Sequence, residues 1–469
     1  MTFEKLSVPG LSDDELATLN ENAEELANKS RRNLLRSSYY DGKRAAQQVG
    51  SVIPPQYANI GLALGWAAKG VDGLARRCNL EKMIWAGGDL DSLGMSELEE
   101  SNFLFSEISQ ARTDSLLHGV SYLITTKGDT TAGEPAALVH AKDALNAYGQ
   151  WNARRRSLDN LLSVTSREDG RITGFVLYLD GLTISADKVD GAWQVSRSEH
   201  PWGVPAEPLV YRPRGSRRMG RSRITRPVMS HQDSALRALV RLEGHMDIYT
   251  IPKLILLGAD ESIFKNADGS QKASWQVALG RTFGIPDDND SQSLNPRADV
   301  KQFDAQSPDS HLAQLNALAK LMARETDLPD SDFALTDMAN PTSADSYSAS
   351  RENLISEAEG TMGDWSVPIR RTVNRALAIQ NGLTEVPEAW GSIETKWRSP
   401  IYLSKAAAAD AGAKQIAVIP WLAETEVGLE LLGLDEQQIR RAMADKRRAA
   451  GRAVVAALTP ASPANANGG

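Results

Sequence analysis

The chain has 469 residues, which is long enough for a large core and for more than one compact lobe. Its hydrophobic fraction of 41% and charged fraction of 24% are ordinary for a soluble protein. No stretch approaches the ~20 apolar residues of a membrane helix. The net charge of −8 argues against a protein that simply wraps nucleic acid, because phosphate binding requires cations. The single cysteine, Cys78, rules out an intrachain disulfide framework and a cysteine-rich zinc site.

The chain begins with helical patterns, and its N-terminus has no secretory signal pattern, so residence in a cytoplasm is expected. Leucines and alanines recur at helical spacing over Leu11–Ser38, with a capping pattern at Ser12–Glu15. A second helix is predicted over Ile60–Arg77. A third is predicted over Ser96–Leu117, where Ser96 and Glu99 form a capping-box pattern. Its candidate core positions are Leu98, Phe103, Phe105, Ile108 and Leu116.

A β-rich stretch follows the third helix. The pair Asp190-Gly191 is a two-residue hairpin signal. Enrichment in β-branched and aromatic residues predicts strands at Gly119–Thr126, Ile172–Leu179, Leu182–Lys188, Ala192–Arg197 and Leu209–Arg212. The predicted fold class is therefore α+β, with helices followed by an antiparallel sheet.

Residues 212–226 hold the highest concentration of charge in the chain. The segment follows the last predicted strand and contains seven arginines: Arg212, Arg214, Arg217, Arg218, Arg221, Arg223 and Arg226. Such a cluster fits contact with a phosphate backbone or with an acidic partner surface. It fits equally well a solvated loop whose arginines pair with acidic residues of a neighbouring lobe or subunit. The sequence does not favour either interpretation.

The second half of the chain contains two helical arms, over Ser230–Ile251 and Ser307–Thr326. In each arm, leucines and a methionine recur at helical spacing and form a narrow apolar stripe. Ser307 followed by Pro308 is a typical helix start. A glycine-containing insert lies between the arms. Two helices joined by a small subdomain, instead of a short turn, are an unusual arrangement and the first indication of function.

The remainder of the chain is mostly helical. A loop, Asp327–Thr342, leads into a long helical stretch at Ser343–Ile379, where Pro368 predicts a kink. Helices are also predicted near the C-terminus, up to Leu458. The tail from Thr459 to Gly469 is of low complexity and is expected to be disordered.

No catalytic, cofactor-binding or metal-binding motif is recognisable. The sequence lacks a phosphate-binding P-loop, a G-x-S-x-G nucleophile elbow and an H-E-x-x-H zinc motif. The six histidines are scattered, and no two of them share metal-ligand spacing on one predicted helix. No enzyme activity, cofactor or metal is therefore predicted.

Several segments in order resemble the portal proteins of tailed phages, specifically the siphophage-type family common in actinobacterial phages. The resemblance covers nearly the whole chain. It consists of diffuse patterns, not invariant motifs, whose order and spacing along the chain agree with the family. Beside the N-terminal helix ending in YYDG and the HGVSYLITT stretch, it is carried by residues 251–269, 298–329, 340–359, 396–415 and 428–441.

The resemblance implies a portal fold with an α/β wing, a helical stem hairpin interrupted by a small clip subdomain, a long kinked helix and a helical crown. The implied domains are the wing (1–229), stem helix 1 (230–256), the clip (257–306), stem helix 2 (307–326), the tunnel loop (327–342), the long kinked helix with the rest of the wing (343–395), the crown (396–458) and a disordered tail (459–469).

The resemblance also implies a dodecameric ring at one capsid vertex that conducts double-stranded DNA during packaging and ejection. Expected partners are terminase, the head–tail connector (adaptor), and the major capsid and scaffold proteins, with no membrane. The alternative is another virion structural protein or a nucleic-acid-binding protein. Residues expected to line the DNA channel are Asp337, Met338, Asn340, Arg237, Arg241 and Lys253. The seven arginines of residues 212–226 are expected to contact neighbouring subunits or DNA.

Overall fold

The computed structural model describes residues 4–43, 61–249, 253–257, 269–270, 299–303, 307–333, 351–401 and 405–458. The chain divides into two compact units, residues 1–398 and residues 399–469. The mixture of helices and antiparallel sheets confirms the predicted α+β class. No described helix has the length and the apolar character needed to cross a membrane.

The N-terminal part of the first unit contains four helices: α1 (Asp13–Tyr40), α2 (Trp66–Ala75), α3 (Met95–Asn102) and α4 (Leu104–His118). Ser12 and Glu15 form the predicted capping box at the start of α1.

The single helix predicted over residues 96–117 is instead the pair α3 and α4. Phe103 interrupts it with a φ of 48°, and its side chain is 76% exposed. Phe103 is therefore not a core residue, whereas the neighbouring Leu98 and Ile108 are buried as predicted. The predicted capping box at Ser96 is also wrong, because α3 begins after Gly94 and the Ser96 hydroxyl bonds to Asp91.

The described part of the first unit contains four antiparallel sheets, the fourth of which follows with the helical pair below. The five-stranded sheet joins β4 (Ala147–Asn152), β5 (Ser157–Glu168), β6 (Arg171–Leu179), β7 (Leu182–Val189) and β8 (Ala192–Glu199) in chain order. The three-stranded sheet has the order β3 (Ala137–Asp143), β2 (Val120–Lys127) and β9 (Ala206–Val210). A third sheet pairs β1 (Leu80–Trp85) with β12 (Ile393–Trp397).

The predicted strands correspond to β2, β6, β7, β8 and β9, whereas β1, β3, β4, β5 and β12 were not predicted. Asp190 and Gly191 form the predicted turn between β7 and β8, with φ values of 51° and 84°. The last predicted strand, 209–212, is shifted. β9 ends at Val210, and Arg212 has a φ of 48°, which an extended strand does not accommodate.

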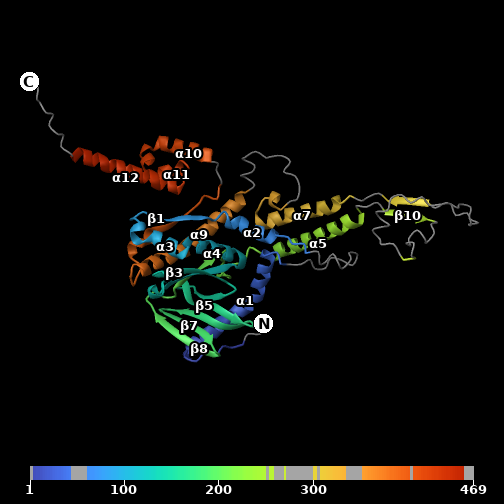
Figure 1. Ribbon diagram of the computed structural model, residues 1–469, viewed down its shortest axis with the longest axis horizontal. Coiled ribbons are helices and arrows are strands. Elements are labelled where there is room, and N and C mark those ends of the chain that lie inside the picture. The colour runs from blue at the N-terminus through green and yellow to red at the C-terminus, as the bar shows by residue number, and fades with distance from the viewer. Residues whose placement is uncertain are drawn as a thin grey trace, which may run out of the picture. The chain divides into compact units, whose positions relative to one another are not determined.

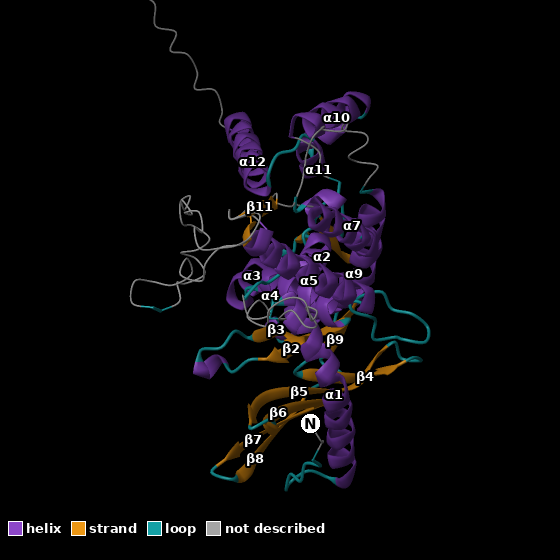
Figure 2. Ribbon diagram, turned by 90° about the vertical axis from the view of Figure 1, so that its right-hand side faces the viewer, coloured by secondary structure: helices purple, strands orange, loops and turns teal. Residues whose placement is uncertain are grey.

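The long helix α9 (Glu352–Gln380) lies at the centre of the first unit. It runs through Pro368 and packs against β2 and β9. Trp365 is fully buried, and its indole N–H donates to the carbonyl oxygen of Val210 at 3.1 Å. Figure 2 shows α3, α4 and α9 on one side of the three-stranded sheet and the five-stranded sheet on the other, with α1 alongside. The core of this unit is therefore built around α9.

A pair of antiparallel helices extends from this core. The helices are α5 (Arg226–Tyr249) and α7 (Asp309–Thr326), and they lie side by side (Figure 1). Between α5 and α7, the described strands β10 (Lys253–Leu257) and β11 (Asp299–Phe303) pair antiparallel as a two-stranded ribbon. The Ser307 hydroxyl accepts a hydrogen bond from the N–H of Asp309, but the helix begins one residue after Pro308.

The second unit is helical. It contains α10 (Lys405–Val418), α11 (Glu426–Leu431) and α12 (Glu436–Leu458). Thr425 caps α11 by accepting from the N–H of Gly428 at 3.1 Å. The expected disordered tail, residues 459–469, lies outside the described residues. Short 3₁₀ helices in the two units occur at Asp91–Leu93, Thr130–Ala132, Asp330–Asp332, Glu388–Ser392 and Pro420–Glu424.

Candidate functional site

The arginine-rich segment, residues 212–226, connects β9 to α5 and is held by backbone hydrogen bonds. The N–H of Arg221 donates to the carbonyl oxygen of Tyr211 at 3.0 Å, and that of Arg223 donates to Leu116 at 2.8 Å. Gly220 has a φ of +65°, and a Cβ there would lie 2.3 Å from the carbonyl oxygen of Tyr211. Only glycine fits this close approach without movement of the backbone. The segment is thus fixed to the core before α5 begins.

Arg223 is buried at the point where the helical pair meets the core. Its Nη1 lies 2.6 Å from a carboxylate oxygen of Glu357 on α9, and both side chains are less than a tenth exposed. The same guanidinium donates to the carbonyl oxygens of Gly70 on α2 and of Thr326 at the end of α7. One side chain therefore connects α2, α7 and α9.

The surroundings of Arg223 keep it charged. Burial opposes the charge, but the interactions with Tyr211 and Glu357 outweigh that penalty, so the pKa of Arg223 is raised. The Tyr211 hydroxyl also donates to Glu357, and burial raises the pKa of Tyr211 to about 12. The structure thus places Arg223 inside the chain, where its guanidinium bonds to Gly70, Thr326 and Glu357, whereas the sequence led us to expect contact with DNA or a neighbouring subunit.

Arg212 lies on the solvent side of the group formed by Arg223, Tyr211 and Glu357. Its guanidinium is 2.7 Å from Glu357 and 3.9 Å from Asp327, and it lies over the ring of Tyr211. Its side chain is 44% exposed. Arg212 therefore neutralises a buried carboxylate, although part of it remains accessible.

The other five arginines of the segment lie nearer the surface. Arg214, Arg217, Arg218 and Arg226 are exposed, and Arg221 is half-buried. The backbones of Arg214 and Arg217 form an isolated β-bridge, which tightens the loop. Arg218 lies over the ring of Trp151 at 5.5 Å from the centroid. These positions, unlike Arg223, can meet another molecule.

The residues predicted to line a DNA channel are only partly described. Arg237 and Arg241 are half-buried on α5, and Arg237 donates to the hydroxyl of Ser234 at 2.9 Å. Lys253 opens β10, but its side chain lies outside the described residues. Asp337, Met338 and Asn340 also lie outside the described residues.

The structure brings together two histidines that the sequence left apart. His245 on α5 and His311 on α7 meet edge to face, with ring centroids 5.1 Å apart. The two histidines belong to different helices, so the spacing of histidines along one predicted helix gives no sign of the pair. Partial burial, followed by the charges of His245 and Arg241, lowers the pKa of His311. This contact lies at the interface between the two helices.

Acidification is expected to loosen the α5–α7 pair. A histidine with a lowered pKa binds its proton more readily when unfolded, so its stabilising contribution is complete above the usual pKa of 6.5 and is lost as the pH falls through the lowered value. Limited proteolysis between pH 7.5 and pH 5 should show faster cleavage within these helices at the lower pH. His311→Gln should weaken that pH dependence. An identical pH dependence in both proteins would contradict the role of the pair.

Among the residues that the structure describes, no group of three or more His, Cys, Asp or Glu side chains is arranged to hold a metal ion. Cys78 is buried, and burial raises the pKa of its thiol to about 12. A thiol with so high a pKa is almost entirely protonated near neutral pH and is a weak nucleophile. The site is a charged junction where Arg223 joins α2, α7 and α9.

Comparison with known proteins identifies the family. Residues 21–451 match the model of the phage portal protein family described as SPP1 Gp6-like. The chain therefore belongs to the SPP1 Gp6-like phage portal protein family. This membership confirms the predicted function class, and portal proteins are structural components of virions, not enzymes.

Curated relatives include the portal protein of Mycobacterium phage D29, which is 24% identical over 419 residues, 88% of this chain and 83% of the relative. The portal protein of Mycobacterium phage L5 is 25% identical over 390 residues, 81% of this chain and 77% of the relative. Both come from phages of an actinobacterial genus, which agrees with the predicted group.

Two solved structures align with much of the chain. The neck of an empty gene transfer agent particle with C6 symmetry matches at 15% identity and a TM-score of 0.42, covering 83% of this chain and 92% of that chain. The neck of the native particle with C12 symmetry matches at 16% identity and a TM-score of 0.40, covering 79% and 90%. With TM-scores this low, these likenesses add nothing to the family assignment.

Proposed function

We propose that this chain forms the dodecameric ring at the unique capsid vertex, and that double-stranded DNA passes through the ring during packaging and ejection. The family match over residues 21–451 is the observation that carries the proposal. The helical pair α5 and α7, with the β10–β11 ribbon in the connection between them, fits a stem that leads into a clip. A cyclic ring requires two different faces on each subunit, and this asymmetric first unit offers them.

We assign the portal domains to consecutive ranges of the chain. The described elements fit this assignment, because α5 and α7 lie in the proposed stem and α10–α12 lie in the proposed crown. The assignments are the wing at 1–229 with its C-terminal part in 343–395, the stem helices at 230–256 and 307–326, the clip at 257–306, the tunnel loop at 327–342, the crown at 396–458 and the tail at 459–469.

The DNA-facing surface of the ring is proposed to include the stem and the tunnel loop. Cations on the stem would approach phosphates transiently, and the acidic net charge of −8 would keep a polyanion from being held. The residues proposed to line the channel are Arg237, Arg241 and Lys253 of the stem and Asp337, Met338 and Asn340 of the tunnel loop.

The exposed arginines of residues 212–226, which directly precede the first stem helix α5, are proposed to contact the neighbouring subunit. Arg214, Arg218 and Arg226 are exposed, and each carries a guanidinium suited to bidentate pairing with a carboxylate. The chain has 60 acidic residues, so complementary partners on an adjacent copy are plentiful. These contacts would be heterologous, as ring closure demands.

A position at the capsid vertex would bring the ring into contact with the other proteins of packaging and assembly. The clip is proposed to dock terminase during packaging and the head–tail connector afterwards. The ring is proposed to assemble in the host cytoplasm with scaffold and major capsid proteins. No cofactor or catalytic role is proposed for the chain itself.

The oligomeric state of the purified chain tests this proposal. Native mass measurement is expected to give a particle of twelve times the 50.9 kDa of one chain, and negative-stain images should show a central hole. A capsid or minor head protein would give no such closed ring with a central hole. A monomer that bound DNA tightly, with a steep salt dependence removed by replacing Arg214 and Arg218, would favour the nucleic-acid-binding alternative.

A further inference from the structure

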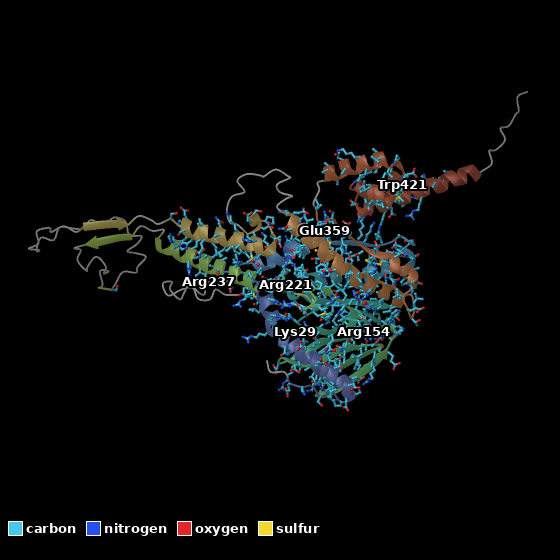
Figure 3. All side chains as sticks on the ribbon, turned by 180° about the vertical axis from the view of Figure 1, so that it is seen from behind. Lys29, Arg154, Arg221, Arg237, Glu359 and Trp421 are labelled. Carbon is cyan, nitrogen blue, oxygen red and sulfur yellow. The ribbon has the colours of Figure 1, made fainter. Side chains whose placement is uncertain are left out.

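A basic cavity lies between α1, β2 and the arginine-rich segment. Its volume is about 230 Å³, which is well above the roughly 10–15 Å³ that one water molecule needs. No aspartate or glutamate is among the described residues that line it. Figure 3 labels Lys29 on α1, and Arg221 near the start of α5. The basic residues lining the cavity are Lys29, Arg32, Arg36, His118, Arg217 and Arg221.

Two buried polar atoms of the lining have no hydrogen-bond partner among the described residues. They are Nε of Arg36 and Nδ1 of His118. The Nη1 of Arg36 donates to the carbonyl oxygen of His118 at 3.1 Å and to the side-chain oxygen of Asn33 at 3.3 Å, so the guanidinium is held in place. Buried polar atoms in folded proteins nearly always have a partner, and an unpaired one calls for an explanation. A bound anion would supply the missing partner.

The positive charge at the cavity is only partly compensated. Among the basic residues that line it, Lys29 has an ion pair, and the carboxylate of Asp143 acts on His118. Burial, followed by the charges of Arg32 and Arg217, lowers the pKa of Arg36 to about 10. Lys29 is paired with Glu25 at 3.1 Å and lies over the ring of Tyr148. The four arginines have no ion pair within the described part of the chain. The excess charge therefore comes from guanidinium groups brought together from α1 and from the loop.

We propose that this cavity binds a phosphate group, held by Arg36 and Arg32 of α1 and by Arg217 and Arg221 of the loop. A phosphate offers several acceptor oxygens and up to two negative charges, so it matches several convergent guanidinium forks better than a single carboxylate does. His118 lies in the same lining and, in its neutral form, can donate one further hydrogen bond. The phosphate comes either from the DNA backbone or from a free phosphate compound.

The test is isothermal titration of the full-length protein with inorganic phosphate, in a phosphate-free buffer at low salt. The double variant Arg217→Gln/Arg221→Gln changes only the loop and is expected to weaken binding at least tenfold. Arg154→Gln is a control at a distant site, because Arg154 is exposed on the β4–β5 turn, away from the cavity lining (Figure 3). It removes one positive charge and should leave phosphate binding unchanged. A thermal unfolding scan of each variant checks that the fold is retained.

A second titration with a short DNA duplex separates the two sources of phosphate. If DNA binds, is displaced by inorganic phosphate and is lost in the double variant, the ligand is the DNA backbone. If inorganic phosphate binds through the arginines and DNA does not compete, the ligand is a free phosphate compound. Either result supports the site. The proposal is overturned if the wild-type protein binds neither, if the double variant binds phosphate as well as the wild type does, or if Arg154→Gln weakens binding equally.

A carboxylate of a second copy is the competing occupant. It would be indicated if phosphate failed to bind the assembled protein while the double variant failed to assemble. That result would also overturn the proposal. The outcome is independent of the ring test above, since a phosphate site can exist in a monomer and a ring can form without one.

Discussion

Arg223→Met is expected to lower the free energy of unfolding of the first unit by about 3–5 kcal/mol, the range seen when one partner of a buried ion pair is removed. The substitution would leave the buried carboxylate of Glu357 without its closest cation. It would also remove the donor to the carbonyl oxygens of Gly70 and Thr326. The midpoint of urea denaturation, followed by circular dichroism, measures the change.

Arg212→Met is the control for this prediction. Arg212 contacts the same carboxylate at 2.7 Å, but its side chain is 44% exposed. Exposed ion pairs contribute about 1 kcal/mol or less, so the control should shift the midpoint little. Replacing both buried partners, as in Arg223→Met with Glu357→Leu, should recover part of the loss, because no uncompensated charge is then buried. Equal losses for the two arginine variants would show that burial does not set their contributions.

Gly220→Ala is expected to destabilise the first unit by about 2–5 kcal/mol. Gly220 has a φ of +65°, which disfavours any Cβ by about 1–2 kcal/mol. The new methyl group would also lie 2.3 Å from the carbonyl oxygen of Tyr211 and 2.5 Å from that of Gly119. These are backbone atoms, so relief requires the loop itself to move, at a further cost of about 1–3 kcal/mol. Thermal unfolding of the purified variant measures the sum.

Gly215 provides the matched control in the same loop. An added Cβ there meets nothing within 4 Å, and Gly215 is not among the glycines with positive φ. Gly215→Ala should therefore be neutral or slightly stabilising. Because Gly220→Ala displaces the neighbouring Arg221, it should also weaken phosphate binding at the cavity, whereas Gly215→Ala should not. Similar stabilities of the two variants would mean that the loop yields more easily than its hydrogen bonds indicate.

Strong periodicity in the sequence predicted the helices well and the strands in part. The stretches that became α1, α5 and α7 carry regular apolar spacing, and the structure places helices there. Strands β3, β4 and β5 were missed because pairing with neighbours, not composition, makes them strands. The break at Phe103 was missed because a bulky residue with positive φ is rare, and only tertiary packing holds it there.

The sequence predicted the arginine-rich segment at residues 212–226, but it did not predict the role of each arginine in it. The sequence shows seven arginines in 15 residues, yet it cannot show that Arg223 is buried. The groups that bind its guanidinium lie 153, 103 and 134 positions away along the chain, at Gly70, Thr326 and Glu357. A signal for the phosphate cavity did exist, since Arg32 and Arg36 are four positions apart on one predicted helix and share a face.

The contacts of Arg223 also bear on how this chain can change between related phages. One guanidinium holds both Thr326 at the end of α7 and Glu357 near the start of α9, so the chain between them must leave and return to one place. The entropy of closing such a loop rises slowly, by only about 0.6 kcal/mol for each doubling of its length. Insertions and deletions between these two anchors are therefore thermodynamically mild. We therefore expect variants with a longer or shorter segment between these anchors to keep the structure of the core around α9.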